Sequence, residues 1–196
     1  IVHQAGKIAA DKPVIIYCFS RKDTEQWAQK LVRHGYAAAA YHAGLDPEVR
    51  KKTQEQFLRD EVSIIVATIA FGMGIHKPDV RLVIHTSMPK TVEGYYQETG
   101  RAGRDGLPSD CVLFYSYGDK HKQDFFINQI EDEHERAQTR EKLSHMIAFC
   151  ESFTCRRKFL LAYFGENTDY TACGNCDSCV SEETFFDATE IKQKIL

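Results

Sequence analysis

Short apolar segments alternate with longer amphipathic segments over the first 118 residues of the chain. The apolar segments have few polar interruptions, as is typical of strands buried on both faces of a sheet: residues 14–18, 37–41, 62–67, 80–85 and 111–115. The amphipathic segments have apolar residues at helical spacing: residues 22–34, 46–60 and 91–99. Strands that alternate with helices predict right-handed crossovers and an α/β fold with a doubly wound parallel sheet.

Residues at the ends of the predicted helices support these limits. Asp46-Pro47-Glu48 combines an N-cap, a proline suited to the first turn and an acid that complements the helix dipole. Gly35 stands where the preceding helix is expected to end. In doubly wound sheets, ligands bind at the loops that follow the carboxyl ends of the strands. We predict those loops at residues 19–21, 42–44 and 68–74.

The pattern changes after about residue 118. Residues 119–129, 132–151 and about 152–164 read as three helices, and Gly165 is the expected end of the third. A loop that carries three cysteines follows. We therefore expect a lobe over residues 1–118, a small helical subdomain over residues 119–181 and a tail or linker over residues 182–196. Both ends of the chain are abrupt, which indicates a piece of a longer protein.

Composition and charge exclude several classes of protein. Hydrophobic residues make up 43% of the 196 residues and charged residues 27%, as in ordinary globular proteins. The formal net charge of −3 gives no global sign of nucleic-acid binding, which would depend on local basic clusters such as residues 156–158. No apolar run approaches the length of a membrane span, and the first residues lack the order of a secretion signal.

Four of the seven cysteines have the spacing C-x17-C-x2-C-x2-C: Cys155, Cys173, Cys176 and Cys179. Two-residue spacers let a tight turn direct successive thiolates at one ion, and four sulfurs are a usual ligand set for structural zinc. An iron–sulfur cluster is an alternative, although the further cysteine and proline of bacterial ferredoxin motifs are absent. A redox pair of Cys176 and Cys179 is another, but no βαβ unit surrounds it. The odd number of cysteines also favours a reducing compartment.

Residues 95–106 (YYQETGRAGRDG) place two arginines three positions apart near the end of a predicted helix. This spacing puts Arg101 and Arg104 on the same helical face. A guanidinium is always charged, and its fork of donors suits phosphate oxygens. The glycines around the two arginines allow close approach of a nucleotide. We interpret the segment as a polyphosphate-binding device; two surface arginines in ion pairs are the alternative.

Four stretches together resemble one family: residues 14–21 (VIIYCFSR), 38–45 (AAAYHAGL), 64–81 (IIVATIAFGMGIHKPDVR) and 95–108 (YYQETGRAGRDGLP). With the cysteines, they are similar in order and spacing to the second motor lobe and zinc-binding subdomain of RecQ-family DNA helicases, over roughly residues 1–181. The resemblance implies a RecA-like helicase C-terminal lobe followed by a helical subdomain with structural Zn²⁺. It also implies ATP and Mg²⁺ in a cleft between two lobes, and 3′-to-5′ unwinding of DNA in recombination and repair.

The resemblance also implies roles for single residues. Arg104 would be the arginine finger that reaches the triphosphate, Arg101 its partner, and Gln97 a group that positions the phosphates or the attacking water. Gly72 and Gly74 would let the backbone approach the nucleotide. Contacts with DNA would come from six residues: Ser20, Arg21, His42, Thr68, Arg156 and Arg157. For the last two, structural ion pairs beside the metal are an equally weighted alternative.

The sequence lacks a G-x-x-x-x-G-K-[ST] phosphate loop and an Asp-Glu-x-His run for magnesium. We therefore expect the chain to be half of a split active site that hydrolyses no ATP without a first RecA-like lobe of the same protein. The expected partner is DNA, single-stranded or at duplex junctions, in the cytoplasm of a bacterium or the nucleus of a eukaryote, with no membrane involved. Alternatives are a zinc-dependent nucleic-acid-binding module without enzymatic activity and a lobe of an RNA helicase.

Overall fold

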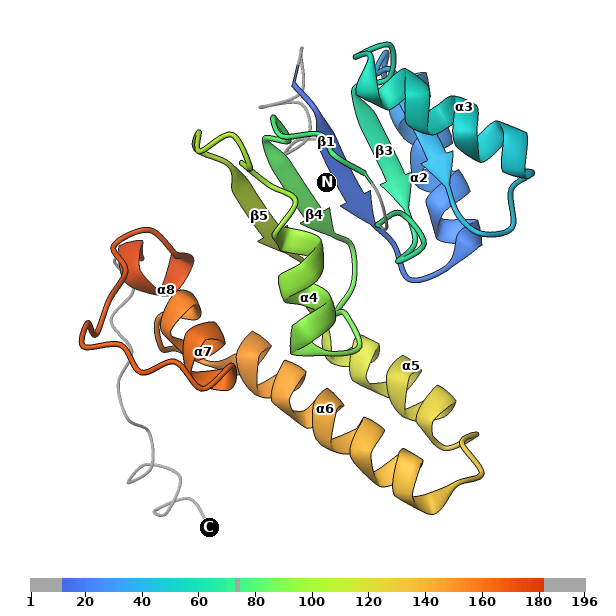
Figure 1. Ribbon diagram of the computed structural model, residues 1–196. Coiled ribbons are helices and arrows are strands. Elements are labelled where there is room, and N and C mark those ends of the chain that lie inside the picture. Colours follow the sequence, from blue (N-terminus) through green and yellow to red (C-terminus); the bar gives the residue numbers. More distant parts are fainter. Residues whose placement is uncertain (1–11, 73–74, 182–196) are drawn as a thin grey trace. The chain divides into compact units, whose positions relative to one another are not determined.

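A computed structural model describes residues 12–72 and 75–181 (Figure 1). The chain divides into two compact units, one that extends to Cys150 and one that begins at Glu151. The first unit therefore includes helices that follow residue 118. The tail predicted for residues 182–196 lies outside the described residues.

Five parallel strands form the sheet of the first unit, in the order β2-β3-β1-β4-β5. Their bounds are Val14–Tyr17 (β1), Ala38–Tyr41 (β2), Ile64–Ala67 (β3), Leu82–His85 (β4) and Asp110–Leu113 (β5). The last residues of the central strands are in register, because Tyr17 pairs with Ala67 on one side and with His85 on the other. The prediction of a parallel α/β sheet is confirmed, and the carboxyl ends of its strands meet at one edge.

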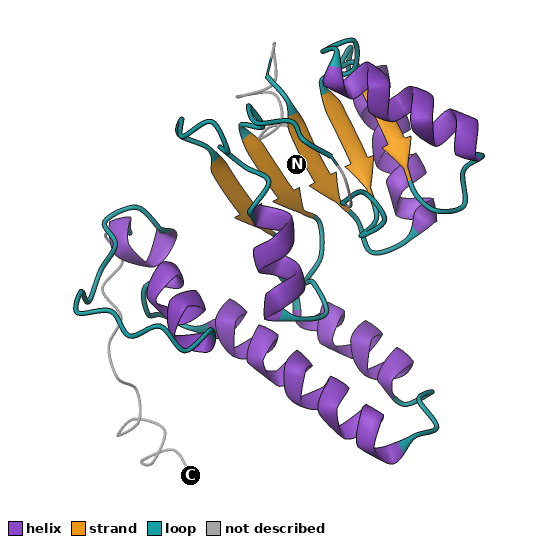
Figure 2. Cartoon of the chain, in the orientation of Figure 1, coloured by secondary structure: helices purple, strands orange, loops and turns teal. Residues whose placement is uncertain are grey.

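Helices pack against both faces of this sheet. They include α2 (Arg21–Arg33), α3 (Pro47–Leu58) and α4 (Val92–Thr99). Successive strand residues point to opposite faces, so Ile16 joins a buried cluster with Leu31 of α2, whereas Ile15 joins one with Phe57 of α3. Figure 2 shows the five strands as one sheet with these helices beside it. This is the doubly wound arrangement that the sequence predicts.

Polar side chains at the loop–helix junctions fix where these helices begin. Each accepts a backbone N–H from the first helical turn, at 2.8–3.1 Å: Ser20, Asp46 and Thr91. The first N–H groups of a helix have no partner within it, so such caps stabilise the start of the helix. The predicted N-cap at Asp46 is confirmed. Ser20 and Thr91 place the starts of α2 and α4 near the carboxyl ends of β1 and β4.

Four further helices follow the sheet: α5 (Tyr117–Ile127), α6 (Glu133–Glu151), α7 (Arg156–Tyr163) and α8 (Asp177–Val180). The start of α7 lies four residues later than predicted, because the hydroxyls of Ser152 and Thr154 bond to each other at 2.7 Å and Ser152 Oγ accepts the Thr154 N–H at 3.1 Å. Such local bonds compete with a helix. The predicted end at Gly165, which has φ +84°, is confirmed.

The second unit has almost no buried core. Among its described residues, only Cys155 is buried. Apolar burial is the main favourable term in folding, so this unit needs another source of stability. No helix among the described residues combines the length and apolar character needed to cross a membrane.

Candidate functional site

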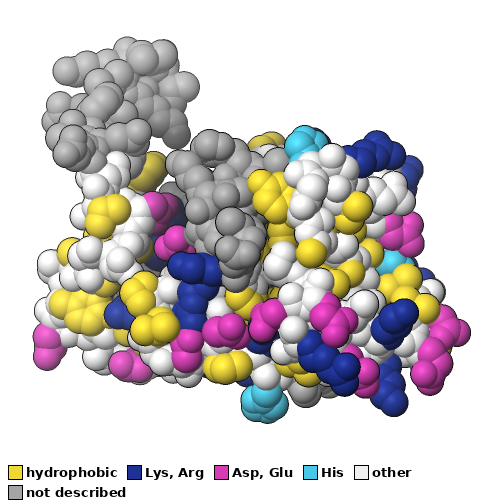
Figure 3. Space-filling view, turned by 90° about the horizontal axis from the view of Figure 1, so that it is seen from above, with side chains coloured by type: hydrophobic (Ala, Val, Ile, Leu, Met, Phe, Trp, Pro, Cys, Tyr) yellow, Lys and Arg dark blue, Asp and Glu magenta, His cyan; other side chains and the backbone are white. Residues whose placement is uncertain are grey.

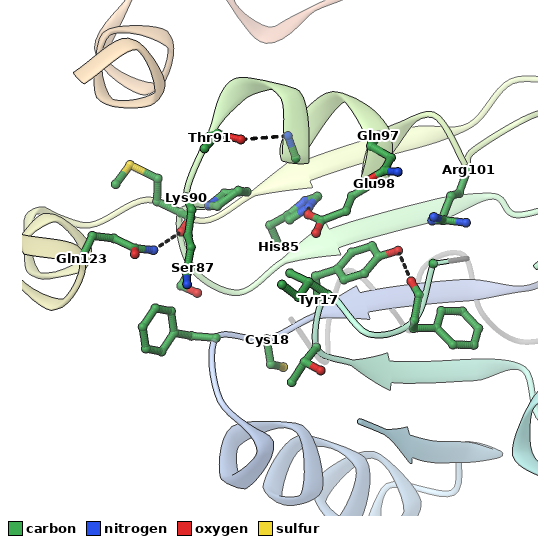
Figure 4. Close-up of a pocket in the computed structure, with 18 residues that line it drawn as sticks. Tyr17, Cys18, His85, Ser87, Lys90, Thr91, Gln97, Glu98, Arg101 and Gln123 are labelled. Atoms are coloured by element: carbon green, nitrogen blue, oxygen red, sulfur yellow. Dashed lines mark hydrogen bonds and ion pairs between the residues drawn. The ribbon is translucent and has the colours of Figure 1, made fainter. Parts of the chain in front are cut away.

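A cavity of about 510 Å³ opens at the carboxyl edge of the sheet in the first unit. The ends of β1, β3 and β4 contribute Tyr17, Thr68 and His85 to its lining, and the end of α4 and the turn after it contribute Gln97 and Arg101 (Figure 4). The cavity therefore lies where ligands bind in open α/β sheets. Described residues of the loop predicted to bind a ligand after β3, from Thr68 to Gly72, contribute to its lining.

Arg101 is the buried cation of this cavity. Its side chain lines the cavity, the residue is only 7% exposed, and its Nε has no hydrogen-bond partner among the described residues. A buried donor without a partner costs free energy, which an acceptor at this position would offset. Gly72 permits the position of the guanidinium, because a Cβ atom there would stand 2.8 Å from Arg101 Nη2.

A buried polar group supports the same side of the cavity. His85 Nε2 lies 2.7 Å from Glu98 Oε2, and both residues are buried. The His85 ring stacks on Tyr17 with centroids 5.2 Å apart. Burial raises the pKa of Tyr17 well above its usual range, against a lowering effect of the nearby Arg101. Glu98 precedes Arg101 by three residues, so this group holds the segment that carries the arginine.

Arg104 is placed differently. α4 ends at Thr99, so the two arginines do not share a helical face as predicted: Arg101 is buried and Arg104 is exposed. Arg104 Nε donates to the carbonyl of Gly100 at 2.9 Å. Arg81 holds the loop that follows Arg104, through an ion pair with Asp105 and hydrogen bonds to the Leu107 carbonyl and the Ser109 hydroxyl. The Arg104 side chain is thus exposed, on a turn next to the loop that Arg81 holds.

The other residues predicted to contact a nucleotide lie near Arg101. Gln97 is exposed and lines the cavity, and Gly72 lines it as well. Thr68 is half-buried at the end of β3, and its Oγ1 accepts the Ala70 N–H at 3.5 Å. The structure therefore brings Gln97, Thr68, Gly72 and Arg101 together. Gly74 lies outside the described residues.

Three residues predicted to contact DNA surround the start of α2. The Ser20 hydroxyl donates to Asp23 Oδ2 at 2.6 Å and caps the helix. Arg21 is exposed and lies over Gly44, where a Cβ atom would stand 2.8 Å from its Nη1. His42 is buried at 3% exposure, and its Nε2 lies 3.2 Å from a carboxylate oxygen of Glu25. Arg21 is therefore the most accessible group of the three.

The four clustered cysteines of the second unit form a metal-binding arrangement. The Sγ atoms of Cys155, Cys173, Cys176 and Cys179 all lie within 4.8 Å of one another. Cys173 Sγ and Cys179 Sγ are 3.9 Å apart, close to the ~3.8 Å edge of a tetrahedron with Zn–S distances of about 2.3 Å. The geometry fits one tetrahedral ion.

The surroundings of the cysteines shift the pKa values of two of them in opposite directions. The Asn175 N–H, with other donors, lowers the pKa of Cys173 to about 6. Burial, with the neighbouring Cys176, raises the pKa of Cys179 to about 11. The Arg156 N–H, at the start of α7, donates to Cys176 Sγ at 3.4 Å. A cation bound between the four sulfurs would supply the positive charge that favours thiolates at both Cys173 and Cys179.

The two arginines after Cys155 differ in their surroundings. Arg156 Nε and Nη2 both donate to the Asp177 carboxylate, at 3.0 and 3.1 Å. This pair ties the start of α7 to α8 and so braces two cysteine-bearing segments. Arg157 is exposed. The structural ion pair considered as an alternative is thus present at Arg156, and DNA contact at either residue stays a prediction.

Sequence reasoning missed several residues that hold the site. Tyr17, His85 and Glu98 support Arg101, and Arg81 holds the loop that carries Arg104. A usable signal was present for one of them, because His85 is a polar residue at the end of an otherwise apolar strand. The sequence analysis also did not name Asp177 as the partner of Arg156, although Asp177 lies between two of the cysteines.

Comparisons with known proteins agree with this arrangement. Residues 2–106 match the helicase conserved C-terminal domain and residues 117–180 match the RecQ zinc-binding domain. The chain is 43% identical over 194 residues to the ATP-dependent DNA helicase RecQ of Bacillus subtilis, covering 99% of this chain and 31% of that protein. It is 50% identical over 182 residues to an ATP-dependent DNA helicase of Schizosaccharomyces pombe, covering 90% of this chain and 14% of that protein. The chain thus spans less than a third of the length of these relatives.

Solved structures share the fold of the lobe. The helicase Lhr of Mycobacterium smegmatis, solved with single-stranded DNA and AMP-PNP, has a TM-score of 0.53 and 25% identity, over 65% of this chain and 18% of that chain. The zinc-binding match supports zinc over the iron–sulfur and redox alternatives for the four cysteines. With one family domain over more than half of its residues and the RecQ zinc-binding domain over most of the rest, this chain belongs to the RecQ family of helicases.

Proposed function

We propose that this chain is the second RecA-like lobe and zinc-binding part of an ATP-dependent helicase that moves 3′ to 5′ along DNA in recombination and repair. In this proposal a first lobe of the same protein holds ATP and Mg²⁺, and this chain completes the site from across a cleft. The names of the Bacillus and Schizosaccharomyces relatives support the activity. The sequence supports the division between lobes, because it has no phosphate-binding loop.

The environment of Arg101 is the observation on which the proposal rests. It is a permanent cation, nine-tenths buried at the carboxyl edge of the sheet, with an Nε donor that has no acceptor among the described residues. A phosphate oxygen is the acceptor that a guanidinium binds best. Gln97 lines the same cavity and offers an amide for a second contact with phosphate or with the attacking water.

We assign the two arginines different tasks. An arginine finger must project beyond its own lobe to reach phosphates held by another, and the exposed side chain of Arg104 meets this requirement. Arg101 is buried beside Gly72 and is therefore suited to contact the phosphate from a fixed position within the lobe. Charge that develops on the transferred phosphoryl group is stabilised by such guanidinium groups, which contribute about 10³- to 10⁵-fold in rate.

The proposed DNA track starts at the same edge of the sheet. Arg21 and Thr68 would offer a cation and a hydroxyl to the phosphates of a single strand, and Ser20 and His42 are less accessible than Arg21. Figure 3 shows the opposite side, near the amino ends of the strands, where basic and acidic side chains are interspersed. With a formal net charge of −3 for the chain, binding to DNA would depend on a few placed residues.

Substitution of the arginines in the complete helicase tests the proposal. We expect Arg101→Ala and Arg104→Ala each to lower the rate of DNA-stimulated ATP hydrolysis at least a thousandfold, while the Kd for single-stranded DNA changes less than threefold. Arg33→Ala is a matched control, since Arg33 is an exposed arginine in the last turn of α2. Hydrolysis that survives both active-site substitutions would overturn the assignment.

Two further measurements separate the alternatives. A lobe of a DNA helicase should show stronger stimulation of hydrolysis by single-stranded DNA than by RNA of the same length; the reverse order would favour an RNA helicase. The isolated chain should hydrolyse no ATP, and turnover by it would contradict the split site. A nucleic-acid-binding module without enzymatic activity would show no turnover even in the complete protein.

A further inference from the structure

The hydroxyl of Tyr17 is a polar group in an apolar cluster. Tyr17 is 4% exposed at the end of β1, and its hydroxyl donates to the carbonyl of Phe71 at 3.0 Å. A phenylalanine would fill almost the same volume, so packing alone does not account for the oxygen. Burial raises the pKa of this hydroxyl, which therefore keeps its proton and stays a donor at neutral pH.

The acceptor of this hydrogen bond belongs to the loop after β3. The Phe71 ring is fully buried against Tyr41 and Phe57, with centroids 4.8 and 5.8 Å apart. The next residue, Gly72, is the one whose backbone lies against the Arg101 guanidinium. The Tyr17 hydroxyl thus fixes the backbone one residue away from the contact with Arg101.

The ring of Tyr17 contacts the other element of the site. It stacks on His85 at 5.2 Å with an interplanar angle of 19°, and His85 bonds to Glu98 at 2.7 Å. Glu98 lies in the last turn of α4, three residues before Arg101. In Figure 4, Tyr17 lies between the loop that contains its acceptor and the group formed by His85 and Glu98. One side chain therefore contacts both supports of Arg101.

We propose that Tyr17 is a positioning residue for ATP hydrolysis: it fixes the loop after β3 relative to the end of α4 and so keeps the Arg101 guanidinium oriented toward the phosphate. The inference rests on the proposed role of Arg101. Tyr17 itself touches no substrate in this scheme, and its effect passes through Gly72 and Arg101. When a side chain that acts on the reacting groups is displaced by about an ångström, the rate of the reaction falls steeply.

Tyr17→Phe in the complete helicase tests the inference, because it removes one oxygen and retains the stacked ring. We expect about a tenfold lower kcat for ATP hydrolysis, the loss of one well-placed hydrogen bond, with KM for ATP and Kd for single-stranded DNA within twofold of the parent. Tyr41→Phe is the matched control, since Tyr41 packs on the same Phe71 ring in the same cluster. It should leave kcat unchanged. Assays well below the unfolding temperature separate the effect from loss of folded protein.

A double variant shows whether the effect passes through Arg101. Gly72→Ala displaces the guanidinium directly, so Tyr17→Phe combined with it should cost less than the product of the two single losses. Fully multiplicative losses, an unchanged kcat in Tyr17→Phe, or an equal loss in Tyr41→Phe would each overturn the inference. Those outcomes, with Arg101→Ala inactive, leave the proposed function standing. If Arg101→Ala retains hydrolysis, the proposed function itself fails.

Discussion

The guanidinium of Arg101 lies directly against the backbone of Gly72, so close that a Cβ atom on that residue would be 2.8 Å from Nη2. The atom in the way is the end of a flexible side chain, not backbone. A larger residue at position 72 would therefore move the arginine and leave the surrounding fold in place. The absence of a side chain at Gly72 therefore allows the Arg101 guanidinium to keep its orientation.

We expect Gly72→Ala to lower the rate of ATP hydrolysis by the complete helicase about 10- to 100-fold, because the Arg101 side chain must shift. The melting temperature should change by less than about 2 °C, since no backbone atom is crowded at under 3 Å. Steady-state kinetics and calorimetry measure the two effects. Gly44→Ala is the matched control, because its Cβ would displace Arg21 instead. An equal loss of hydrolysis in the control at saturating DNA would contradict this account.

The ion pair between Arg81 and Asp105 predicts a pH dependence of stability. The hydrogen bond from Arg81 holds the pKa of the Asp105 carboxyl below its ordinary value. A lowered carboxyl pKa contributes stability above the unfolded-state pKa, and that contribution is lost as pH falls through the folded-state pKa. Asp105→Asn should therefore lower the melting temperature at pH 7, and the difference from the parent should shrink below about pH 4. A constant difference from pH 7 to pH 3 would show that the carboxylate charge plays no part.

Removal of zinc should unfold the second unit selectively. Structural zinc contributes on the order of 10 kcal/mol of folding free energy, and only Cys155 is buried among the described residues of this unit. After chelation, amide hydrogen exchange should rise sharply in α7 while the amides of β1 and β3 stay protected. Metal analysis should give one colourless zinc per chain, with release on acidification because the thiols regain protons. A brown chromophore, or unchanged exchange in α7, would contradict the assignment.

Arg156 and Arg157 should respond differently to substitution. Arg156→Ala removes the partner of Asp177, so we expect faster loss of zinc to a chelator. Arg157→Ala should weaken binding to single-stranded DNA and reduce the slope of log K against log salt by about 1, as for one phosphate contact. Zinc release kinetics and salt titrations give the two readouts. The reverse pattern would assign the DNA contact to Arg156.

The layout of the sheet could be predicted from the sequence because its central strands are buried on both faces. Val14, Ile64 and Leu82 begin strands without a polar interruption, and few other structures produce such short apolar runs. The start of α7 could not be predicted, because the turn at Ser152 and Thr154 depends on two hydroxyls that a helix would also tolerate. Apolar spacing carries no information on such side-chain bonds.

The parts of the candidate site that could be predicted are formed by residues that lie close together in the sequence. Two-residue spacers brought Cys173, Cys176 and Cys179 together, as the structure shows. The orientation of Arg101 and Arg104 could not be predicted, because it depends on where α4 ends and on the turn at Gly103, which has φ +60°. The support by Tyr17 and His85 was missed for another reason. It joins strands that are adjacent in the sheet but 68 positions apart in the chain, and no short motif records that contact.

The Nε of Arg101 has no hydrogen-bond partner among the described residues, so the stability of the lobe depends on whether an acceptor binds there. A buried donor without an acceptor destabilises the free lobe, and an oxyanion bound to this donor would offset that free-energy cost. In the proposed function, phosphate binding at this atom would therefore stabilise the lobe, and phosphate release would lower the stability of the segment that carries Arg101.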